Sequence, residues 1–585
     1  GFFSSGSLFI LLLSLSSAAK IPSLSSAILQ SQPLAESHNN KGKPSLSCGL
    51  CTVIVDTVRY MISQEKDEAA IDEFLRRSCI TLNIEQKHVC DTIIKAFSNE
   101  AYFVLERALF TPEEICGMFL PDCGTPVNPL HIQWPLDIPK AKPPLRPWPV
   151  IPEGKPTVRV LHLSDIHVDR DYAEGSEADC QRDNWLSSYA LCCRNYPDST
   201  ASEKVKYPAG KWGSPFNCDI PFRTFESAIQ YIAQTQTKLD WVIVTGDKEA
   251  HDMWDYTKEK TEKNIANITE TLLHYFPGVK IYEAVGNHEG VPMDAMAPHT
   301  MEQYDTRGPQ WLYDLLAEKW SQWISPEAQL SVKFRASYVE YPLPGLKLIS
   351  LNTIYCSTFN FYLYINQTDP DGTLAWLVEQ LLDSEERGEK VHIISHIPAG
   401  DNYCLKGWAH NFYEIVNRFE NTIAGQFYGH THNDHFEVYY EDSNPSGRPT
   451  HFNFISPSVT TYTDNNPSFR IYTIDAGYYG ATATVKDAET YSADVAEANE
   501  SGRDLEWKLL YSTKEAYGMK DLSPASWHNL IERMSMDPTL FRSFHQHYYR
   551  RTDYEVECWE EEECRKKYIC PLRAAKSYEL DHFCT

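Results

Sequence analysis

Five apolar segments between residues 158 and 430 each end at a residue type that can bind a metal ion. A buried strand that ends at a carboxylate, an amide or an imidazole is costly unless that group finds a partner, and one shared metal site would satisfy all of these groups. In Asp165-Ile166-His167 and His430-Thr431-His432 the polar residues alternate, so on an extended chain both members of each pair point the same way. The candidate ligands are Asp165, His167, Asp247, Asn287, His396, His430 and His432.

This ligand set suits divalent cations of hard to borderline character, because it combines carboxylates, imidazoles and one amide oxygen without a thiolate. One ion needs about four to six donors, so the set fits two ions better than one. Two ions about 3.5–4 Å apart, joined by a bridging carboxylate, can activate water and clamp a phosphoryl group for in-line displacement. Taken singly, each motif is more often a turn or a satisfied core histidine, but their joint occurrence favours a two-metal site.

From residue 158 to about residue 485 the chain alternates β-rich and helical segments, which is typical of an α/β domain with buried sheets. Residues 491–585 are mostly helical by pattern. The predicted strands are 158–165, 240–247, 279–287, 346–352, 390–396, 424–430 and 451–457.

The N-terminal part of the chain divides into four segments of different composition. Residues 1–19 hold an apolar run followed by small residues, which is typical of a secretory signal peptide too short to span a bilayer. Residues 20–47 are rich in Ser and Pro and predict a flexible leader. Residues 48–124 show helical periodicity and six cysteines, which predicts a small helical domain with three disulfides. Residues 125–156 are a proline-rich linker, either a stiff spacer or a strap across a neighbouring surface, and Trp134 and Trp148 favour the strap.

Charge and cysteine content exclude some classes of protein. With 53 Lys+Arg and 80 Asp+Glu the formal charge is −27, which argues against a nucleic-acid binder. Sixteen cysteines and three acceptor sequons, at Asn267, Asn366 and Asn499, favour an oxidising compartment, so we expect a secreted or lysosomal protein. After the first twenty residues there is no apolar run long enough to cross a bilayer, so no transmembrane anchor is expected.

The motifs D-x-H, GD, GNH, H and GHxH occur here in the order typical of the metallophosphoesterase superfamily. The segments SDIHVDRDY, TGDKEAHD, AVGNHEG, HIISHIPAGD and FYGHTHNDHFEVYY closely resemble the acid sphingomyelinase family, and the six-cysteine block resembles a saposin domain. The resemblance implies an α+β multidomain fold. A small all-α saposin domain (48–124) would precede an α/β metallophosphoesterase domain (157–490), a two-sheet β-sandwich flanked by helices, and a helical C-terminal subdomain (491–585).

The resemblance also implies roles for individual residues, with two Zn²⁺ ions as cofactors. Asp165, His167, Asp247 and His432 would hold one ion, and Asp247, Asn287, His396 and His430 the other, with Asp247 bridging. His288, in the GNHE motif, would protonate the leaving group, and His251, in the Ala-His-Asp stretch after Asp247, is the second candidate for this role. Lys248-Glu249 departs from the family pattern, since less charged residues are expected beside the bridging aspartate. Two charges there could shift the pKa values of the site, but we interpret this dipeptide as a mutually paired surface turn.

The cysteine pairing rests on the resemblance, because the sequence alone leaves the partners open. The family scheme would pair Cys48 with Cys123, Cys51 with Cys116, Cys79 with Cys90, Cys180 with Cys192, Cys193 with Cys218, Cys356 with Cys404, Cys558 with Cys564, and Cys570 with Cys584. The adjacency of Cys192 and Cys193 makes their two pairs the least determined.

The function implied by the resemblance is zinc-dependent hydrolysis of sphingomyelin to ceramide and phosphocholine at a membrane surface, favoured at acid pH. A monomer would bind lipid peripherally through its saposin domain. One alternative is a secreted phosphodiesterase of nucleotides or other soluble phosphodiesters, and a second is an inactive lipid-binding or transfer protein. The six-cysteine block favours the lipid substrate over the first alternative, and the intact ligand motifs argue against the second.

Overall fold

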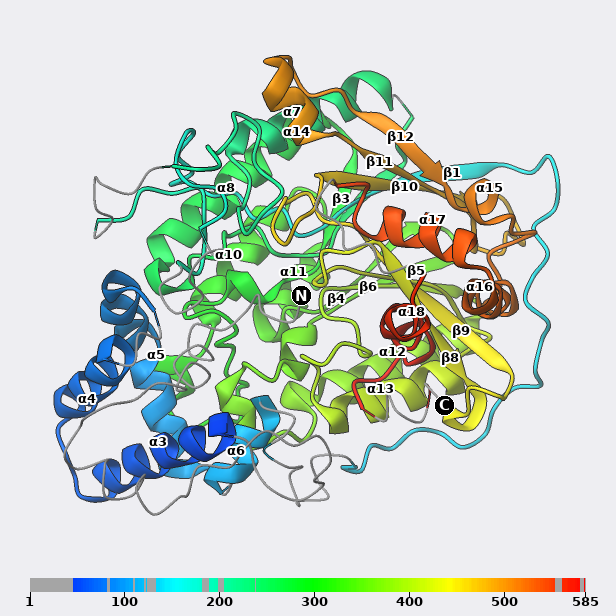
Figure 1. Cartoon of the computed structure of the whole chain (residues 1–585). Coiled ribbons are helices and arrows are strands. Elements are labelled where there is room, and N and C mark those ends of the chain that lie inside the picture. The colour runs from blue at the N-terminus through cyan, green and yellow to red at the C-terminus, as the bar shows by residue number, and fades with distance from the viewer. Residues whose placement is uncertain are drawn as a thin grey trace. The chain divides into compact units, whose positions relative to one another are not determined.

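The computed structural model describes residues 46–81, 85–108, 111–119, 123, 133–180, 189–197, 205–236, 238–552, 560–578 and 583 (Figure 1). The chain divides into a first unit, of residues 1–128, 181–190 and 196–202, and a second unit, of residues 129–180, 191–195 and 203–585. The expected signal peptide and the expected leader up to residue 45 lie outside the described residues.

In the first unit the described residues form helices and no strand, as the periodicity predicts. The helices are α3 (Leu46–Ser63), α4 (Glu68–Thr81), α5 (Lys87–Arg107) and α6 (Pro112–Phe119). Val58, Ile71 and Tyr102 form a small buried core, and half-buried apolar side chains such as Ile62 and Phe74 pack around it. The disulfides join Cys48 to Cys123, Cys51 to Cys116 and Cys79 to Cys90.

In the second unit, the first sheet is mixed, with strand order β12-β11-β10-β1-β2-β3. Its strands are β1 (Thr157–Leu163), β2 (Trp241–Val244), β3 (Lys280–Glu283), β10 (Ser468–Asp475), β11 (Val485–Ser492) and β12 (Lys508–Ser512). Strands β1, β2 and β3 run parallel, whereas β10, β11 and β12 extend the sheet from β1 by antiparallel pairing.

The second sheet is also mixed, with strand order β4-β5-β6-β7-β9-β8. Its strands are β4 (Tyr338–Leu343), β5 (Leu346–Leu351), β6 (Lys390–Ser395), β7 (Ile423–Tyr428), β8 (His435–Tyr440) and β9 (Pro449–Ile455). The four inner strands are parallel, and β4 and β8 close the two edges by antiparallel pairing. Buried apolar side chains dominate the inner strands, which is typical of parallel strands covered on both faces.

The two sheets pack face to face through aromatic rings. Tyr472 of the first sheet lies 4.9 Å from Phe427 and 5.0 Å from Phe454 of the second, measured between ring centroids. Helices cover the outer faces: α12, α13 and α16 contact the second sheet, and Tyr231 of α7 packs its ring near Phe469 of the first. This is the predicted α/β arrangement of two sheets flanked by helices.

The helices of the second unit connect and cover these strands. They are α7 (Phe222–Thr235), α8 (Lys258–Tyr275), α9 (Tyr304–Arg307), α10 (Gln310–Trp320), α11 (Pro326–Arg335), α12 (Thr373–Arg387), α13 (Lys406–Arg418), α14 (Val495–Ser501), α15 (Thr513–Tyr517), α16 (Pro524–Met536), α17 (Pro538–Tyr548) and α18 (Glu562–Ile569). Among the described residues, no helix is both long and apolar enough to cross a membrane.

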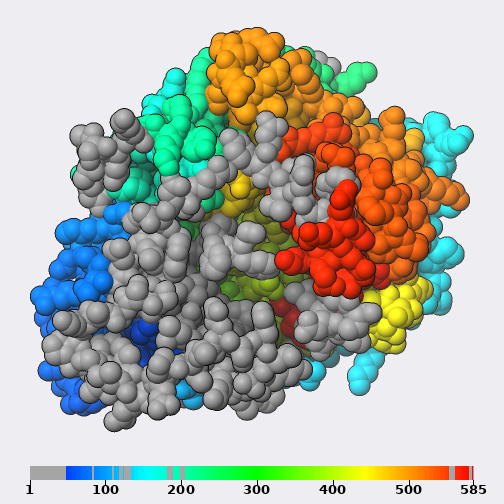
Figure 2. Space-filling model, in the orientation of Figure 1, coloured from blue at the N-terminus to red at the C-terminus, as the bar shows by residue number. Residues whose placement is uncertain are grey.

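All seven predicted strands are present, but the sequence reasoning missed β4, β8, β10, β11 and β12. The C-terminal region, expected to be mostly helical, also contains β12, which pairs with β11 and so belongs to the first sheet. Only one of its five residues is fully buried, which is typical of a short strand at the edge of a sheet. In Figure 2 the residues from about 500 onward, orange to red, lie side by side on one face.

The proline-rich segment is a strap on the second unit rather than a free linker. No helix or strand forms over residues 133–156, as the prolines require. Trp134 is buried and its carbonyl accepts a hydrogen bond from Asn411 Nδ2, at 3.1 Å. Further along, Arg418 Nε donates to the Pro139 carbonyl at 2.8 Å, and the ring of Trp148 packs on His451.

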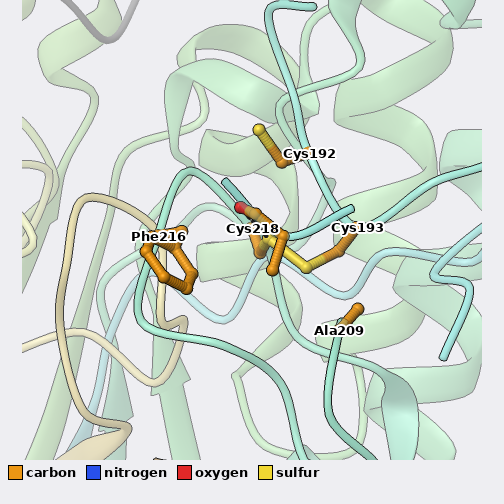
Figure 3. Packing of buried hydrophobic residues seen from close by; sticks show 6 residues of the cluster. Cys192, Cys193, Ala209, Phe216 and Cys218 are labelled. Atoms are coloured by element: carbon orange, nitrogen blue, oxygen red, sulfur yellow. Dashed lines mark hydrogen bonds between the residues drawn. A yellow bond between two sulfur atoms is a disulfide. The ribbon is translucent and has the colours of Figure 1, made fainter. Parts of the chain in front are cut away.

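Three disulfides of the second unit lie within the described residues. They join Cys180 to Cys192, Cys193 to Cys218 and Cys356 to Cys404, as the resemblance implies. Figure 3 shows the Cys193–Cys218 bond within a cluster of buried apolar side chains. Cys564 and Cys570 are also disulfide-bonded, but their expected partners Cys558 and Cys584 lie outside the described residues.

Candidate metal centre

The candidate ligands follow the carboxyl ends of strands from both sheets. Asp165 and His167 follow β1, Asp247 follows β2, and Asn287 lies in a short 3₁₀ helix (Asn287–Glu289) after β3. From the second sheet, His396 follows β6, and the His430-Thr431-His432 segment follows β7. Because β1, β2 and β3 are neighbours and β6 and β7 are neighbours, the strand ends of both sheets bring these loops together.

The ligands form two groups that face each other. In the first group, His432 Nε2 lies 3.2 Å from His167 Nε2 and 3.7 Å from Asp165 Oδ1. Two imidazole nitrogens at this distance repel each other unless a proton or a cation lies between them. A metal ion held jointly by these atoms explains their convergence.

In the second group, His396 Nε2 lies 2.8 Å from Asn287 Oδ1 and 3.0 Å from Asp247 Oδ2. His430 Nδ1 lies 3.1 Å from Asn287 Oδ1 and 3.2 Å from His396 Nε2. Asp247 Oδ2 is also 3.5 Å from His167 Nε2 of the first group. The Asp247 carboxylate therefore lies between the two groups, where a bridging ligand belongs.

Backbone carbonyls orient two of the imidazoles. His167 Nδ1 lies at hydrogen-bond distance from the Glu249 carbonyl oxygen, and His396 Nδ1 lies 2.6 Å from the Thr245 carbonyl oxygen. When Nδ1–H donates to a carbonyl, the tautomer is fixed and Nε2 presents its lone pair to the centre. This outer layer is typical of metal-binding histidines.

The ligand loops also hold unusual backbone conformations. Five of the seven ligands have positive φ, between 40° and 71°: Asp165, His167, Asp247, His430 and His432. Such left-handed residues cost free energy and persist where the surrounding structure requires them, often at functional sites. A Cβ on Gly286 would lie 2.2 Å from Asp247 Oδ1, so only glycine lets these two loops approach so closely.

Most of these imidazoles are in the neutral form that metal binding requires. Burial lowers the pKa of His167, His430 and His432 well below the usual value, so these rings are neutral, the form that ligates metal. Burial raises the pKa of Asp165 to about 7. Burial would also lower the pKa of His396, but the charge of Asp247 outweighs it and raises that pKa to about 9. A metal ion on His396 would therefore have to displace a proton.

The interpretation of Lys248-Glu249 as a surface turn is wrong, because both side chains are fully buried. Lys248 Nζ lies 2.8 Å from Glu283 Oε2 and 3.8 Å from Glu289 Oε1. Glu249 instead binds Arg170, whose Nη1 lies 3.0 Å and 2.7 Å from its two carboxylate oxygens. The dipeptide directly follows Asp247 in the loop after β2, and its charges are paired inside the protein.

Glu289, which the sequence reasoning did not single out, joins two ligand loops. Its carboxylate accepts backbone N–H bonds from Gly286 at 2.6 Å, Lys248 at 2.8 Å and Asp247 at 3.3 Å. These bonds tie the loop after β3 to the loop after β2. The signal was available in the sequence, because Glu289 directly follows the Asn287-His288 ligand motif.

Both predicted proton donors lie beside the first ligand group. A ring nitrogen of each of His167, His251 and His288 lies within 4.8 Å of the others. His288 Nδ1 lies 2.7 Å from the Tyr256 hydroxyl, and burial lowers the pKa of His288 to about 4. His251 Nδ1 lies 2.9 Å from both carboxylate oxygens of Asp219. Asp219 and Tyr256 were not predicted, since neither stands in a motif.

All nine predicted metal-binding and proton-donating residues thus converge on one centre. The chemistry of this donor set, three carboxylate or amide groups and four imidazoles, fits borderline divalent metals. Divalent ions held by these residues would supply activation of water for attack on phosphorus.

Comparison with known proteins identifies related chains. A family described as calcineurin-like phosphoesterase matches residues 158–434, and one described as acid sphingomyelin phosphodiesterase C-terminal region matches residues 449–581. "Sphingomyelin phosphodiesterase 2" of Caenorhabditis elegans is 55% identical over 93% of this chain and 89% of that protein. The human "Sphingomyelin phosphodiesterase" is 36% identical over 92% of this chain and 82% of that protein. The human "Acid sphingomyelinase-like phosphodiesterase 3b" is 29% identical over 70% of this chain and 87% of that protein.

Proposed function

The chain belongs to the acid sphingomyelinase family of phosphodiester hydrolases, and we propose that it hydrolyses sphingomyelin to ceramide and phosphocholine with two bound zinc ions. The observation that carries this proposal is the convergence of seven metal-ligand residues around Asp247 in a chain related to sphingomyelin phosphodiesterases over most of its length. The imidazole-rich ligand set supports zinc among the divalent metals.

When bound, a pair of divalent ions would activate the attacking water and neutralise charge on the phosphoryl oxygens. Asp165, His167, Asp247 and His432 would hold one ion, and Asp247, Asn287, His396 and His430 the other. Carbonyl groups of Thr245 and Glu249 hold two imidazoles in the required tautomer. His251 or His288 is placed to give a proton to the leaving oxygen as its bond to phosphorus breaks.

The helical first unit supports action at a lipid surface as a saposin domain. Around its small core it carries a layer of half-buried apolar side chains, which are Met61, Ile62, Phe74, Leu75 and Leu105. A thin core of this kind can rearrange to bring apolar side chains to lipid. The relatives named sphingomyelin phosphodiesterase align over more of the chain than the human "Acid sphingomyelinase-like phosphodiesterase 3b" does, which favours lipid over soluble phosphodiesters.

An acidic, oxidising compartment is consistent with the chain, and we propose secretion or lysosomal residence. The disulfides require oxidation, and protonation of histidines would reduce the negative net charge near anionic lipid. Among the sequons, Asn267 and Asn366 are exposed and are the proposed glycosylation sites. At Asn499 the side-chain amide is already bonded on both sides, to Trp212 N at 3.1 Å and to the Gly213 carbonyl at 2.9 Å.

The proposal is tested with the full chain produced through a secretory pathway. We expect about two zinc ions per chain by metal analysis and hydrolysis of sphingomyelin vesicles that peaks between about pH 4.5 and about pH 6. A nucleotide phosphodiester measured in parallel tests the soluble alternative. Faster turnover of the nucleotide than of sphingomyelin across that pH range would overturn the lipid assignment, and a chain without metal would overturn the two-metal assignment.

A further inference from the structure

A disulfide that the proposed reaction does not use lies next to one of the two candidate proton donors. Figure 3 shows Cys193 bonded to Cys218 among the buried side chains of Ala209, Phe216 and Cys192. Both cysteines are fully buried, and each is followed in sequence by a charged residue, Arg194 and Asp219 respectively. The two charged residues lead from the disulfide to the loop that carries His251.

Asp219 contacts His251 directly. Its carboxylate oxygens both lie 2.9 Å from His251 Nδ1, and Oδ2 also accepts the backbone N–H of His251 at 2.6 Å. Oδ1 accepts a further bond from the Thr460 hydroxyl at 2.9 Å, and Asp219 is fully buried. The Tyr462 ring stacks on the His251 ring at a centroid distance of 3.9 Å. The imidazole is therefore fixed in position and presents Nε2 toward the centre.

Arg194 holds the same loop from the other side of the disulfide. Its Nη2 donates to Asp252 Oδ2 at 2.7 Å, directly after His251 in the sequence. Its guanidinium also forms a bidentate pair with Asp169, at 2.8 Å and 2.6 Å. Asp169 N in turn donates to the Ile220 carbonyl at 2.8 Å, beside Asp219. Arg194 and Asp219 thus bind two consecutive residues of one loop, Asp252 and His251, and the disulfide links the two segments that carry Arg194 and Asp219.

We infer that the Cys193–Cys218 disulfide, through Asp219 and Arg194, positions His251 as the residue that protonates the leaving group. This inference rests on the proposed function for the identity of the reaction. His288 makes a less suitable donor, because its Nδ1 faces the Tyr256 hydroxyl and not a carboxylate. A carboxylate bonded to Nδ1 fixes the orientation of the ring and directs Nε2 toward the centre, as in other acid–base pairs.

Bonds, electrons and protons balance in this step. The attacking water forms the new P–O bond and gives up a proton to solvent. The P–O bond to ceramide breaks, its electron pair goes to the ceramide oxygen, and the proton on His251 Nε2 moves to that oxygen. Solvent then returns a proton to His251. A 4-nitrophenolate leaving group is a weak base and departs without this proton, so it reports on the rest of the centre alone.

The experiment compares kcat on two substrates, sphingomyelin in detergent micelles and bis(4-nitrophenyl) phosphate, for Asp219→Asn and for the double variant Cys193→Ser/Cys218→Ser. In both variants kcat is expected to fall by about 100-fold or more with sphingomyelin and by less than about 3-fold with the nitrophenyl ester. The matched control, Cys180→Ser/Cys192→Ser, removes the neighbouring disulfide but keeps the bond that flanks Arg194 and Asp219. It is expected to change both rates by less than about 3-fold.

Equal losses on both substrates would show a structural role and overturn the inference, as would unchanged turnover of sphingomyelin in both variants. Asp219→Asn keeps every disulfide, so it tests the positioning role even if the double variant folds poorly. A wild-type chain that cleaves the nitrophenyl ester but not sphingomyelin would overturn the proposed lipid substrate only. The positioning role is then measured with glycerophosphocholine, which also has an alkoxide leaving group, and equal losses on it and the nitrophenyl ester would overturn that role.

Discussion

In the helical first unit, disulfides join the described helices around a small apolar core, whereas in the second unit buried charges and hydrogen bonds join the loops of the metal centre. The first arrangement tolerates movement between helices, because covalent links keep the chain together when the core loosens. The second arrangement does not tolerate it, because each buried charge depends on a partner at a fixed distance. We relate this contrast to the proposed function, because contact with lipid would need a surface that can rearrange, whereas a reaction at two metal ions would need ligands held in fixed positions.

Removing the shared carboxylate should break the metal centre most severely. Asp247→Ala deletes the one ligand that faces both ligand groups, so we expect loss of both metals and at least about a 1,000-fold loss of kcat. Metal analysis and turnover are measured on the same preparation. The exposed Asp305→Ala serves as control, and a metal-replete, active Asp247→Ala protein would rule out the bridging role.

Removing the buried positive charge of Lys248 should lower the stability of the second unit without removing a candidate metal ligand. Lys248→Met leaves Glu283 and Glu289 buried without their counter-ion, which we expect to destabilise the second unit by about 3–5 kcal/mol in chemical denaturation. Adding Glu283→Gln removes one of the uncompensated charges, so the double variant should recover at least about half of that loss. If the double variant is no more stable than Lys248→Met, the charges are not coupled.

Removing a disulfide from the helical unit should weaken that unit and spare the metal centre. Cys79→Ser/Cys90→Ser opens a short loop between α4 and α5, and we expect a loss of about 2–3 kcal/mol. Turnover of bis(4-nitrophenyl) phosphate should stay within about 3-fold of wild type, while hydrolysis of sphingomyelin vesicles falls more steeply. Equal effects on both substrates would contradict the separation between the two regions.

The helical unit should also respond to pH through Glu85. This side chain is buried, its Oε2 has no hydrogen-bond partner among the described residues, and burial raises its pKa to about 8 from 4.5. The folded state therefore favours the neutral carboxyl, whose stabilising effect is complete below pH 4.5 and is lost as the pH rises toward 8.

Between pH 5 and pH 7 we expect the free energy of unfolding of this unit to fall by about 2 kcal/mol. Glu85→Gln should remove that dependence, since glutamine does not titrate. The measurement is chemical denaturation of the full chain followed by a probe on the first unit. If the free energy of unfolding of Glu85→Gln depends on pH as steeply as that of the wild type, other titratable groups cause the effect.

Much of the candidate metal centre could be predicted because its ligands closely follow apolar strands. The end of such a strand is visible in the sequence, and it also fixes the edge of the sheet at which the next residues lie. Asp165, Asp247 and His396 all stand at such strand ends. Asp219 could not be found in this way, since it acts on His251 through a loop that a disulfide brings into place. Lys248 was misplaced for a related reason: a lysine in a turn is usually exposed, and only the folded chain shows the two glutamates that surround it.

The fold shows the same limit. A strand with continuous apolar sequence, such as β2, is evident from composition alone. Edge strands β4 and β12 are half exposed and carry no such signal, so their place is decided by pairing with β5 and β11. Contacts of the proline-rich strap with α13 depend on side chains far away in the sequence, which no local pattern reveals.

The left-handed conformation of five ligands has a consequence for directed evolution of this protein. At each of these positions a glycine would remove the conformational free-energy cost of the left-handed backbone. A library screened only for heat resistance would therefore be enriched in variants in which glycine has replaced a ligand. Thermostable descendants of this chain would then be inert. Selection for durability must therefore be coupled to a catalytic readout in every round, and beneficial substitutions should be sought away from the strand-end loops.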